Sequence, residues 1–192
     1  MAEGDEIGFS GHGWPQYRAE IEAFAGIMKE AGARSYLEVG CLYGDTLHFI
    51  GRQMPKGSKI VAVDLPGSAG GRFKDTGRFL QKAAADLRKA YGHDVEVIIG
   101  NSHDKAIVAE AARYGPYDAV FIDGDHSIKG VRQDWRDYGP LGSIVGFHDI
   151  CRISQKYQDG VKALYDRLSK EYRHQTLSIG DTRRGIGVIW RT

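Results

Sequence analysis

The amino-acid sequence predicts an α/β protein, with a doubly wound and mostly parallel seven-stranded sheet that ends in an antiparallel pair of strands. Short apolar runs rich in Val and Ile alternate with longer stretches whose apolar residues recur at helical spacing. This alternation is typical of strand–helix–strand units and a parallel sheet. The last two apolar runs have no helical stretch between them, so we expect them to pair in antiparallel fashion.

The helices are predicted from apolar residues three and four positions apart. The first helical stretch carries Ile21, Phe24 and Met28 on one face, and Pro15 stands in its first turn, where proline is tolerated. The expected helices cover residues 15–31, 45–52, 76–91, 105–114, 127–138 and 161–171.

The strands are predicted from short apolar runs bounded by polar residues or glycine. They cover residues 35–39, 59–63, 95–99, 117–122, 141–147, 172–179 and 186–190. No repeat, low-complexity segment or linker marks a boundary between domains. We therefore expect a single domain over residues 1–192, with an N-terminal helical segment (1–33) and an α/β core (34–192).

Composition excludes several classes of protein. The 26 basic and 25 acidic residues give a net charge of +1, which shows no nucleic-acid-binding footprint. No window is apolar for long enough to span a membrane, and the acidic N-terminus lacks the order of a signal peptide. Two cysteines, Cys41 and Cys151, are too few for a disulfide scaffold. We therefore expect a cytoplasmic protein that binds neither nucleic acid nor membrane; a homo-oligomer is compatible with these features.

A glycine loop follows the first expected strand, with Gly40 allowing a tight turn and Gly44 allowing close packing of the next helix. Leu42 replaces the second glycine of the dinucleotide fingerprint, which disfavours a pyrophosphate. Glu38 suits a ligand with a cationic amine. Asp64 ends the second strand, 24 residues after Gly40, where a carboxylate can accept both ribose hydroxyls. The alternative is an ordinary glycine turn with incidental acids.

Acidic residues and histidines follow two later strands. Asp123 and His126 come after the run 117–122, and His148 and Asp149 come after the run that ends at Phe147. Because ligands bind at the carboxyl ends of strands in an open parallel sheet, neighbouring strands would bring these side chains together. Such a set can hold a divalent cation and supply a proton acceptor.

Structural roles compete for three residues of this region. Asp125 is more readily interpreted as the cap of the following helix than as a ligand, and Ser127 is a second candidate for that cap. His148 is alternatively a buried histidine that satisfies backbone groups.

These motifs resemble the class I S-adenosylmethionine-dependent methyltransferases. The narrower resemblance is to the metal-dependent small-molecule O-methyltransferases of the catechol, caffeoyl-CoA and cephalosporin-hydroxylase-like types. It covers roughly residues 35–190, and implies a Rossmann-like methyltransferase fold. The motifs are Glu38-x-Gly40-x-x-x-Gly44, Asp64, Phe121–His126 and Gly146–Asp149, and Gly100–Asp104 resembles the segment that contacts adenine in the catechol enzymes.

The resemblance implies S-adenosylmethionine as cofactor and a role for each matching residue. Cofactor-binding residues would be Glu38, Gly40 and Gly44 at the methionine side, Asp64 at the ribose, and Ser102 and His103 at the adenine, with Asp123 beside them. Metal ligands would be Asp123, His148 and Asp149, for Mg or Mn, and His126 would be the base, with Asp123 also catalytic. Relatives usually carry Asp or Glu in place of His148, and a mixed carboxylate–imidazole site suits Mn, Fe or Zn better than Mg.

The function expected from the sequence is metal-assisted O-methylation of a small hydroxylated molecule. A metal-dependent hydrolase that uses the Asp/His cluster is one alternative, although it needs neither the glycine loop nor Asp64. A non-catalytic nucleotide-binding module is another, although it has no use for the Asp/His cluster. A nucleic-acid methyltransferase is disfavoured by the near-neutral charge and by the absence of an Asn-Pro-Pro-Tyr-type motif.

Overall fold

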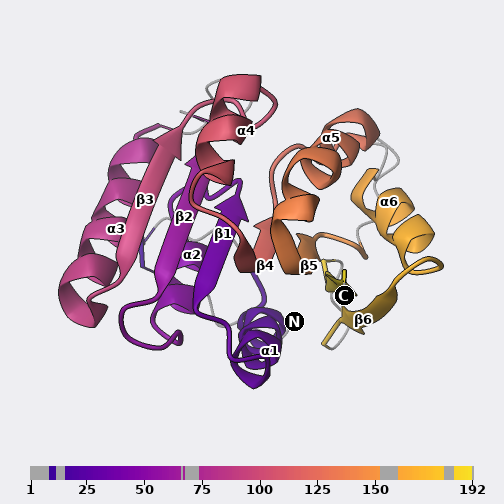
Figure 1. Cartoon of the computed structure of the whole chain (residues 1–192), viewed down its shortest axis with the longest axis horizontal. Helices are drawn as coiled ribbons and strands as arrows, with labels where there is room; N and C mark the ends of the chain where they lie inside the picture. The colour runs from indigo at the N-terminus through magenta and orange to yellow at the C-terminus, as the bar shows by residue number, and fades with distance from the viewer. Residues whose placement is uncertain are drawn as a thin grey trace.

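A computed structural model describes residues 9–11, 16–65, 67, 74–151, 160–179 and 184–191. Its strands form one seven-stranded sheet in the order β3-β2-β1-β4-β5-β7-β6, with β3 and β6 at the two edges (Figure 1). The strands are β1 Ser35–Val39, β2 Lys59–Asp64, β3 Asp94–Ile99, β4 Tyr117–Ile122, β5 Gly142–His148, β6 Arg173–Leu177 and β7 Ile186–Trp190. The helices are α1 Arg18–Glu30, α2 Asp45–Gly51, α3 Thr76–Tyr91, α4 Lys105–Ala112, α5 Ile128–Tyr138 and α6 Gly160–Leu168, with a 3-10 turn at Gly139–Leu141.

The pairing of the strands confirms the expected mostly parallel sheet. β1 pairs in parallel with β2 and β4, and the parallel ladder continues to β3 on one side and to β5 on the other. Among the strands described, β7 alone runs in the opposite direction to the others, and it pairs in antiparallel fashion with β5 and β6. The chain moves outward from β1 to β3 and then returns to lay β4 on the other side of β1. The carboxyl ends of β1 and β4 therefore form the switch point where open α/β sheets bind ligands.

The two faces of the sheet carry separate apolar clusters, which confirms that the sheet is doubly wound. One cluster joins Phe24 of α1, Leu47 of α2 and Leu87 of α3. The other joins α4, α5 and α6, for example through Val131 and Leu164. Successive strand residues alternate between the clusters because side chains of a strand point to opposite faces. Helices on both faces bury the central strands β1, β2, β4 and β5, and leave the carboxyl ends of these strands for the site.

Several element boundaries differ from the expected ones. The first helix begins at Arg18, and Pro15 lies outside the described residues. α5 is capped by Ser127, whose hydroxyl accepts the Gly130 N–H at 3.0 Å, so Asp125 is not its cap. Asp125 instead accepts the Ser127 N–H at 2.8 Å.

The C-terminal elements are shorter than expected. α6 ends at Leu168 rather than at residue 171, because the chain turns there, with the Glu171 N–H donating to Leu168 O at 2.9 Å. β6 covers only Arg173–Leu177 of the expected 172–179. Within the described ranges, no helix has both the length and the apolar character needed to cross a membrane.

Candidate functional site: a cavity at the carboxyl ends of the central strands

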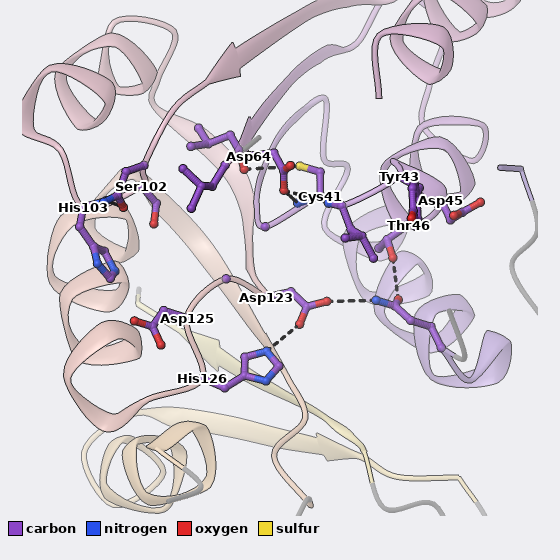
Figure 2. A pocket seen from close by; sticks show the side chains of 17 residues that line it. Cys41, Tyr43, Asp45, Thr46, Asp64, Ser102, His103, Asp123, Asp125 and His126 are labelled. Atoms are coloured by element: carbon purple, nitrogen blue, oxygen red, sulfur yellow. Dashed lines mark hydrogen bonds and ion pairs between the residues drawn. The ribbon is translucent and has the colours of Figure 1, made fainter. Parts of the chain in front are cut away.

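A cavity of about 480 Å³ opens at the carboxyl ends of the central strands. Figure 2 shows Ser102 and His103 on one side of it and Tyr43 and Thr46 on the other, with Asp123 between them. The described wall contains no Lys or Arg, and its acidic residues and histidines are Asp45, Asp64, Asp123, Asp125, His103 and His126. This excess of carboxylates favours a cationic ligand.

The floor of the cavity depends on Gly40. Its φ is +88°, in the left-handed region that favours glycine, and a Cβ there would overlap the backbone of Asp123 and Gly124. The ends of β1 and β4 can approach this closely only because no side chain separates them. Gly44, with φ +81°, does not line the cavity; a Cβ there would lie 3.1 Å from Ala83 Cβ, so this residue allows α2 to pack on α3.

Asp64 ends β2 with one carboxylate oxygen bound and the other available. Its Oδ1 accepts the backbone N–H groups of Cys41 and Leu42, both at 2.9 Å. Its Oδ2 is buried and has no hydrogen-bond partner among the described residues. Burial raises the pKa of Asp64 to about 6, against the lowering effect of the two N–H donors. The ionised Asp64 carboxylate at the cavity wall therefore lowers the stability of the folded protein, because one of its oxygens is buried without a donor from the residues described.

Glu38 lies beneath this wall and is not one of the residues that line the cavity. Its side chain is 1% exposed and accepts the Tyr36 hydroxyl at 2.7 Å. Burial raises the pKa of Glu38 well above its usual range, and the nearby carboxylates of Asp123 and Asp64 add to this rise, while the bond from Tyr36 opposes it. The structure thus places Glu38 next to the cavity floor without presenting its carboxylate to the cavity.

The expected adenine-contacting residues line the cavity, and a buried acid stands behind them. Asp134 of α5 is 0% exposed; its Oδ1 accepts the Ser102 hydroxyl at 3.0 Å and lies 3.3 Å from His103 Nε2. Sequence reasoning missed this residue. A signal existed, because Asp134 lies three residues after Val131 and four before Tyr138, which places it on the buried face of the helix.

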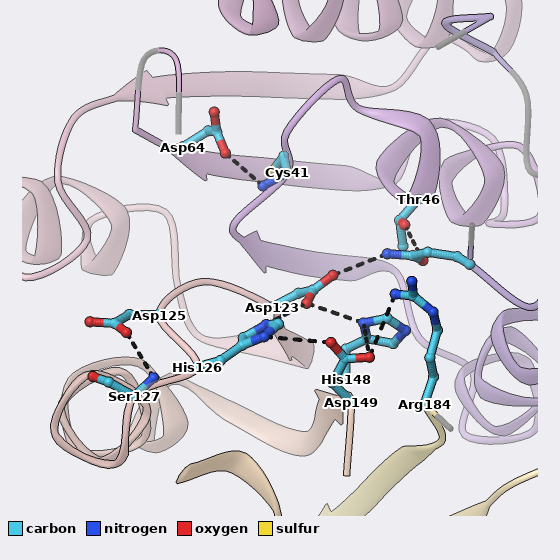
Figure 3. Close-up of polar contacts among 11 residues, drawn as sticks. Cys41, Thr46, Asp64, Asp123, Asp125, His126, Ser127, His148, Asp149 and Arg184 are labelled. Carbon is cyan, nitrogen blue, oxygen red and sulfur yellow. Dashed lines mark hydrogen bonds and ion pairs between the residues drawn. The ribbon is translucent and has the colours of Figure 1, made fainter. Parts of the chain in front are cut away.

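The sheet brings the four predicted residues of the acid–histidine cluster together (Figure 3). Asp123 Oδ1 accepts from His126 Nε2 at 3.1 Å and from His148 Nδ1 at 3.2 Å. Asp149 Oδ2 lies 3.5 Å from His126 Nδ1, and Asp149 Oδ1 lies 3.6 Å from both His148 Nδ1 and the Arg184 guanidinium. Of these residues, Asp123 and His126 line the cavity, and His148 and Asp149 lie behind them.

The charges of the cluster stabilise one another. Burial alone would raise the pKa of Asp123, but the charges and hydrogen bonds of His148 and His126 hold it well below its usual range. Burial would lower the pKa of each histidine, but Asp123 and Asp149 raise both pKa values above the ordinary value. Contacts with Asp123 and Asp149 therefore favour the charged form of both imidazole rings.

The contacts in this cluster do not fit the expected metal. In the part of the chain that the structure describes, no group of three or more His, Cys, Asp or Glu side chains is placed to hold a metal ion. His148 Nδ1 donates to Asp123, and the Arg184 guanidinium lies beside Asp149. The metal-ligand roles of Asp123, His148 and Asp149 stay predictions that these contacts do not support.

Gln16 is a second residue that sequence reasoning missed. Its Nε2 donates to Asp123 Oδ2 at 3.0 Å, and its Oε1 accepts the Thr46 hydroxyl at 2.6 Å. The N–H groups of Phe9 and Ser10 both donate to Asp45 Oδ1 at 2.7 Å. Nothing in the sequence around an isolated glutamine signals this contact. Gln16 therefore forms part of the cavity wall, and Phe9 and Ser10 contact Asp45, which also lines it.

Comparison with known proteins shows the family to which this chain belongs. The family model described as "Methyltransferase domain" matches residues 37–150, more than half of the chain. An O-methyltransferase from Bacillus cereus in complex with S-adenosylhomocysteine (SAH) superposes with a TM-score of 0.69, at 18% identity, over 92% of this chain and 83% of that one. No curated protein matches the chain in sequence.

Two further solved structures have the same fold. The O-methyltransferase TomG from Streptomyces achromogenes, in complex with S-adenosylmethionine (SAM), gives a TM-score of 0.68 at 15% identity, over 92% of this chain and 81% of that one. A candidate caffeoyl-CoA O-methyltransferase from Staphylococcus aureus gives 0.67 at 15% identity, over 92% and 85%. The match to the family model and the shared fold agree: this chain belongs to the methyltransferase domain family and has the class I methyltransferase fold.

Proposed function

We propose that this chain is a SAM-dependent O-methyltransferase that acts on a small molecule with a hydroxyl group. The observation that carries the proposal is Asp64 Oδ2, a buried carboxylate oxygen without a hydrogen-bond partner among the described residues, at the wall of a cavity that also contains His126. A cofactor ribose offers the hydroxyl donors that this oxygen lacks. A histidine in the same cavity is a suitable acceptor for the proton of a hydroxyl group.

The cavity suits SAM in size and charge. Its volume of about 480 Å³ is typical of small-molecule sites. Its carboxylates favour the positive charges of the sulfonium and the amino group, and Gly40 keeps the floor free of a side chain. Leu42 occupies the position at which a dinucleotide would need glycine. We therefore infer that SAM binds and that NAD does not.

His126 is the group to which we assign the proton. When bound, the cofactor supplies an electrophilic methyl group for transfer to oxygen. Both ring nitrogens face carboxylates, since Nε2 donates to Asp123 at 3.1 Å and Nδ1 lies 3.5 Å from Asp149 Oδ2; when the ring is neutral, one of the two carries the lone pair that accepts the proton of the hydroxyl. Asp123 orients the ring and stabilises the imidazolium as it forms. Since Asp123 and Asp149 raise the pKa of His126, the rate should increase as the pH rises through this raised pKa.

Titration calorimetry with SAH, SAM and NAD tests the cofactor assignment. We expect SAH and SAM to bind and NAD not to bind, and the absence of SAH binding would refute the proposal. The acceptor class is tested by incubating the protein with SAM and mixtures of small phenols, alcohols, amines and thiols, followed by mass spectrometry. Methylation restricted to amines or thiols would contradict the assignment of a hydroxyl acceptor.

A further inference from the structure

Asp134 is a fully buried carboxylate that the proposed chemistry does not use. It lies one layer behind the cavity wall, because it contacts Ser102 and His103, which line the cavity, without lining it itself. Burial raises the pKa of Asp134 to about 6, against the lowering effects of His103, the Ser102 hydroxyl and the Asp125 N–H. A buried carboxylate without full compensation is costly to keep, which points to a role beyond packing.

The backbone of the segment that carries Ser102 and His103 is held by other side chains of α5. The Tyr138 hydroxyl donates to Ser102 O at 2.8 Å, and Gln133 Nε2 donates to His103 O at 3.1 Å. These two contacts fix where the segment lies. What Asp134 adds is specific to the side chains of Ser102 and His103.

The contacts of Asp134 determine where the hydrogen atoms of this wall point. An ionised carboxylate only accepts hydrogen bonds, so the single hydroxyl hydrogen of Ser102 must point toward Asp134. The Ser102 oxygen then presents only lone pairs to the cavity. His103 Nε2 lies 3.3 Å from the same carboxylate oxygen but makes no hydrogen bond with it.

We propose that Asp134 is a positioning residue that keeps the Ser102 hydroxyl as a hydrogen-bond acceptor, so that the cavity selects a cofactor base with an exocyclic amino group. This inference rests on the proposed binding of SAM. Adenine carries such an amino group, whereas hypoxanthine carries a carbonyl oxygen in its place. Two acceptors facing each other leave both unpaired, and sites built around a hydrogen bond reject the analogue that lacks it.

The experiment compares SAH with S-inosylhomocysteine, its deaminated analogue, by titration calorimetry. We expect the wild-type protein to bind SAH more tightly by at least about tenfold, which corresponds to the loss of one buried hydrogen bond. Asp134→Asn nearly preserves the shape of the side chain, but its amide can donate to the Ser102 oxygen and release the hydroxyl hydrogen toward the cavity. The preference for SAH should then fall to about threefold or less, or reverse.

Tyr138→Phe is the matched control on the same helix. It removes the hydrogen bond to the Ser102 backbone without changing any donor that faces the cavity. The affinities for both ligands should therefore fall by the same factor, and the ratio of their Kd values should stay as in the wild type. An Asp134→Asn variant with the wild-type ratio would overturn the inference. If that variant does not fold, Ser102→Ala gives the same reading: the ratio must fall toward one, and a retained ratio overturns the inference. A wild-type protein that binds SAH without discrimination refutes the inference alone, whereas a failure to bind SAH refutes the proposed function with it.

Discussion

Asp64→Asn should stabilise the folded protein and at the same time weaken the binding of the cofactor. The amide oxygen of Asn can still accept the N–H groups of Cys41 and Leu42, so the turn after β1 keeps its contacts. The buried Oδ2, however, is replaced by an NH2 group that donates where the carboxylate accepted. The substitution therefore separates the ribose contact from the folding of the turn, which Asp64→Ala would not do.

The gain in stability follows from the pKa of Asp64. A rise from 3.8 to about 6 corresponds to ~3 kcal/mol at about 1.36 kcal/mol per unit. Because the pKa of this acid is higher in the folded state, the cost falls on the ionised folded form; it is fully present above pH 6 and disappears below about pH 4. At pH 8 the neutral amide should raise the free energy of unfolding by up to ~3 kcal/mol, or roughly 6–12 °C in Tm.

The loss in affinity should be on the order of 1–3 kcal/mol, since a charge-assisted hydrogen bond to the ribose is removed. Calorimetry with SAH at pH 8 should therefore show a Kd raised by about 5- to 150-fold, while thermal denaturation without ligand shows a higher Tm. An unchanged Kd would refute the assignment of Asp64 to the ribose. A lower Tm would refute the statement that burial of this carboxylate is costly.

Asp118→Asn provides a control in which the same substitution should change the Tm in the opposite direction. Asp118 Oδ2 accepts from the Arg34 N–H and from the N–H and hydroxyl of Ser35 at 2.8–2.9 Å, at the other end of the sheet from the cavity. Burial acts to raise the pKa of Asp118, but these three donors lower it below its ordinary value. Removing the charge should therefore lower the Tm and leave the Kd for SAH unchanged.

Three further predictions concern the base, the metal and the core. His126→Gln should lower kcat by at least about tenfold with SAH binding intact, as measured by initial rates and calorimetry; full turnover with only a lower Tm would contradict the base assignment. Incubation with EDTA should leave the rate unchanged, and loss of activity that Mn or Mg restores would show that the proton-transfer scheme is incomplete. His93→Ala should cost about 3 kcal/mol in chemical denaturation with kcat unaltered, because it leaves the buried Ser58 N–H and Gly51 O without their partners at 3.1 and 2.9 Å.

Elements with a clear pattern could be predicted from the sequence to the residue. The strand runs 35–39, 117–122 and 186–190 and the helix 76–91 have the bounds that the structure shows. Their apolar residues follow one period throughout and stop at glycine or charged residues. Helix ends were less predictable where local turns compete, as at Leu168, since a further helical turn and a reversal of the chain satisfy the same carbonyl groups.

The location of the site was predictable because it depends on the ends of strands. Asp64, Asp123 and His126 line the cavity, as strand ends in a parallel sheet should. Gln16 could not be found in this way, because its contact with Asp123 joins residues 107 positions apart and belongs to no periodic pattern. Glu38 shows the opposite limit: its position was predicted, but whether its carboxylate faces the cavity or Tyr36 depends on packing.

The contact between Gly40 and the backbone of Asp123 and Gly124 bears on how this protein could change its substrate. At the floor of the cavity, the backbone of Gly40 contacts the backbone of Asp123 and Gly124 directly. Few substitutions are tolerated there, because any side chain at Gly40 would separate the two central strands. Gln16, by contrast, lines the cavity through two hydrogen bonds of its own side chain, to Asp123 and Thr46. Selection for a new acceptor, in nature or in a directed-evolution library, should therefore accept substitutions at Gln16 more readily than at Gly40.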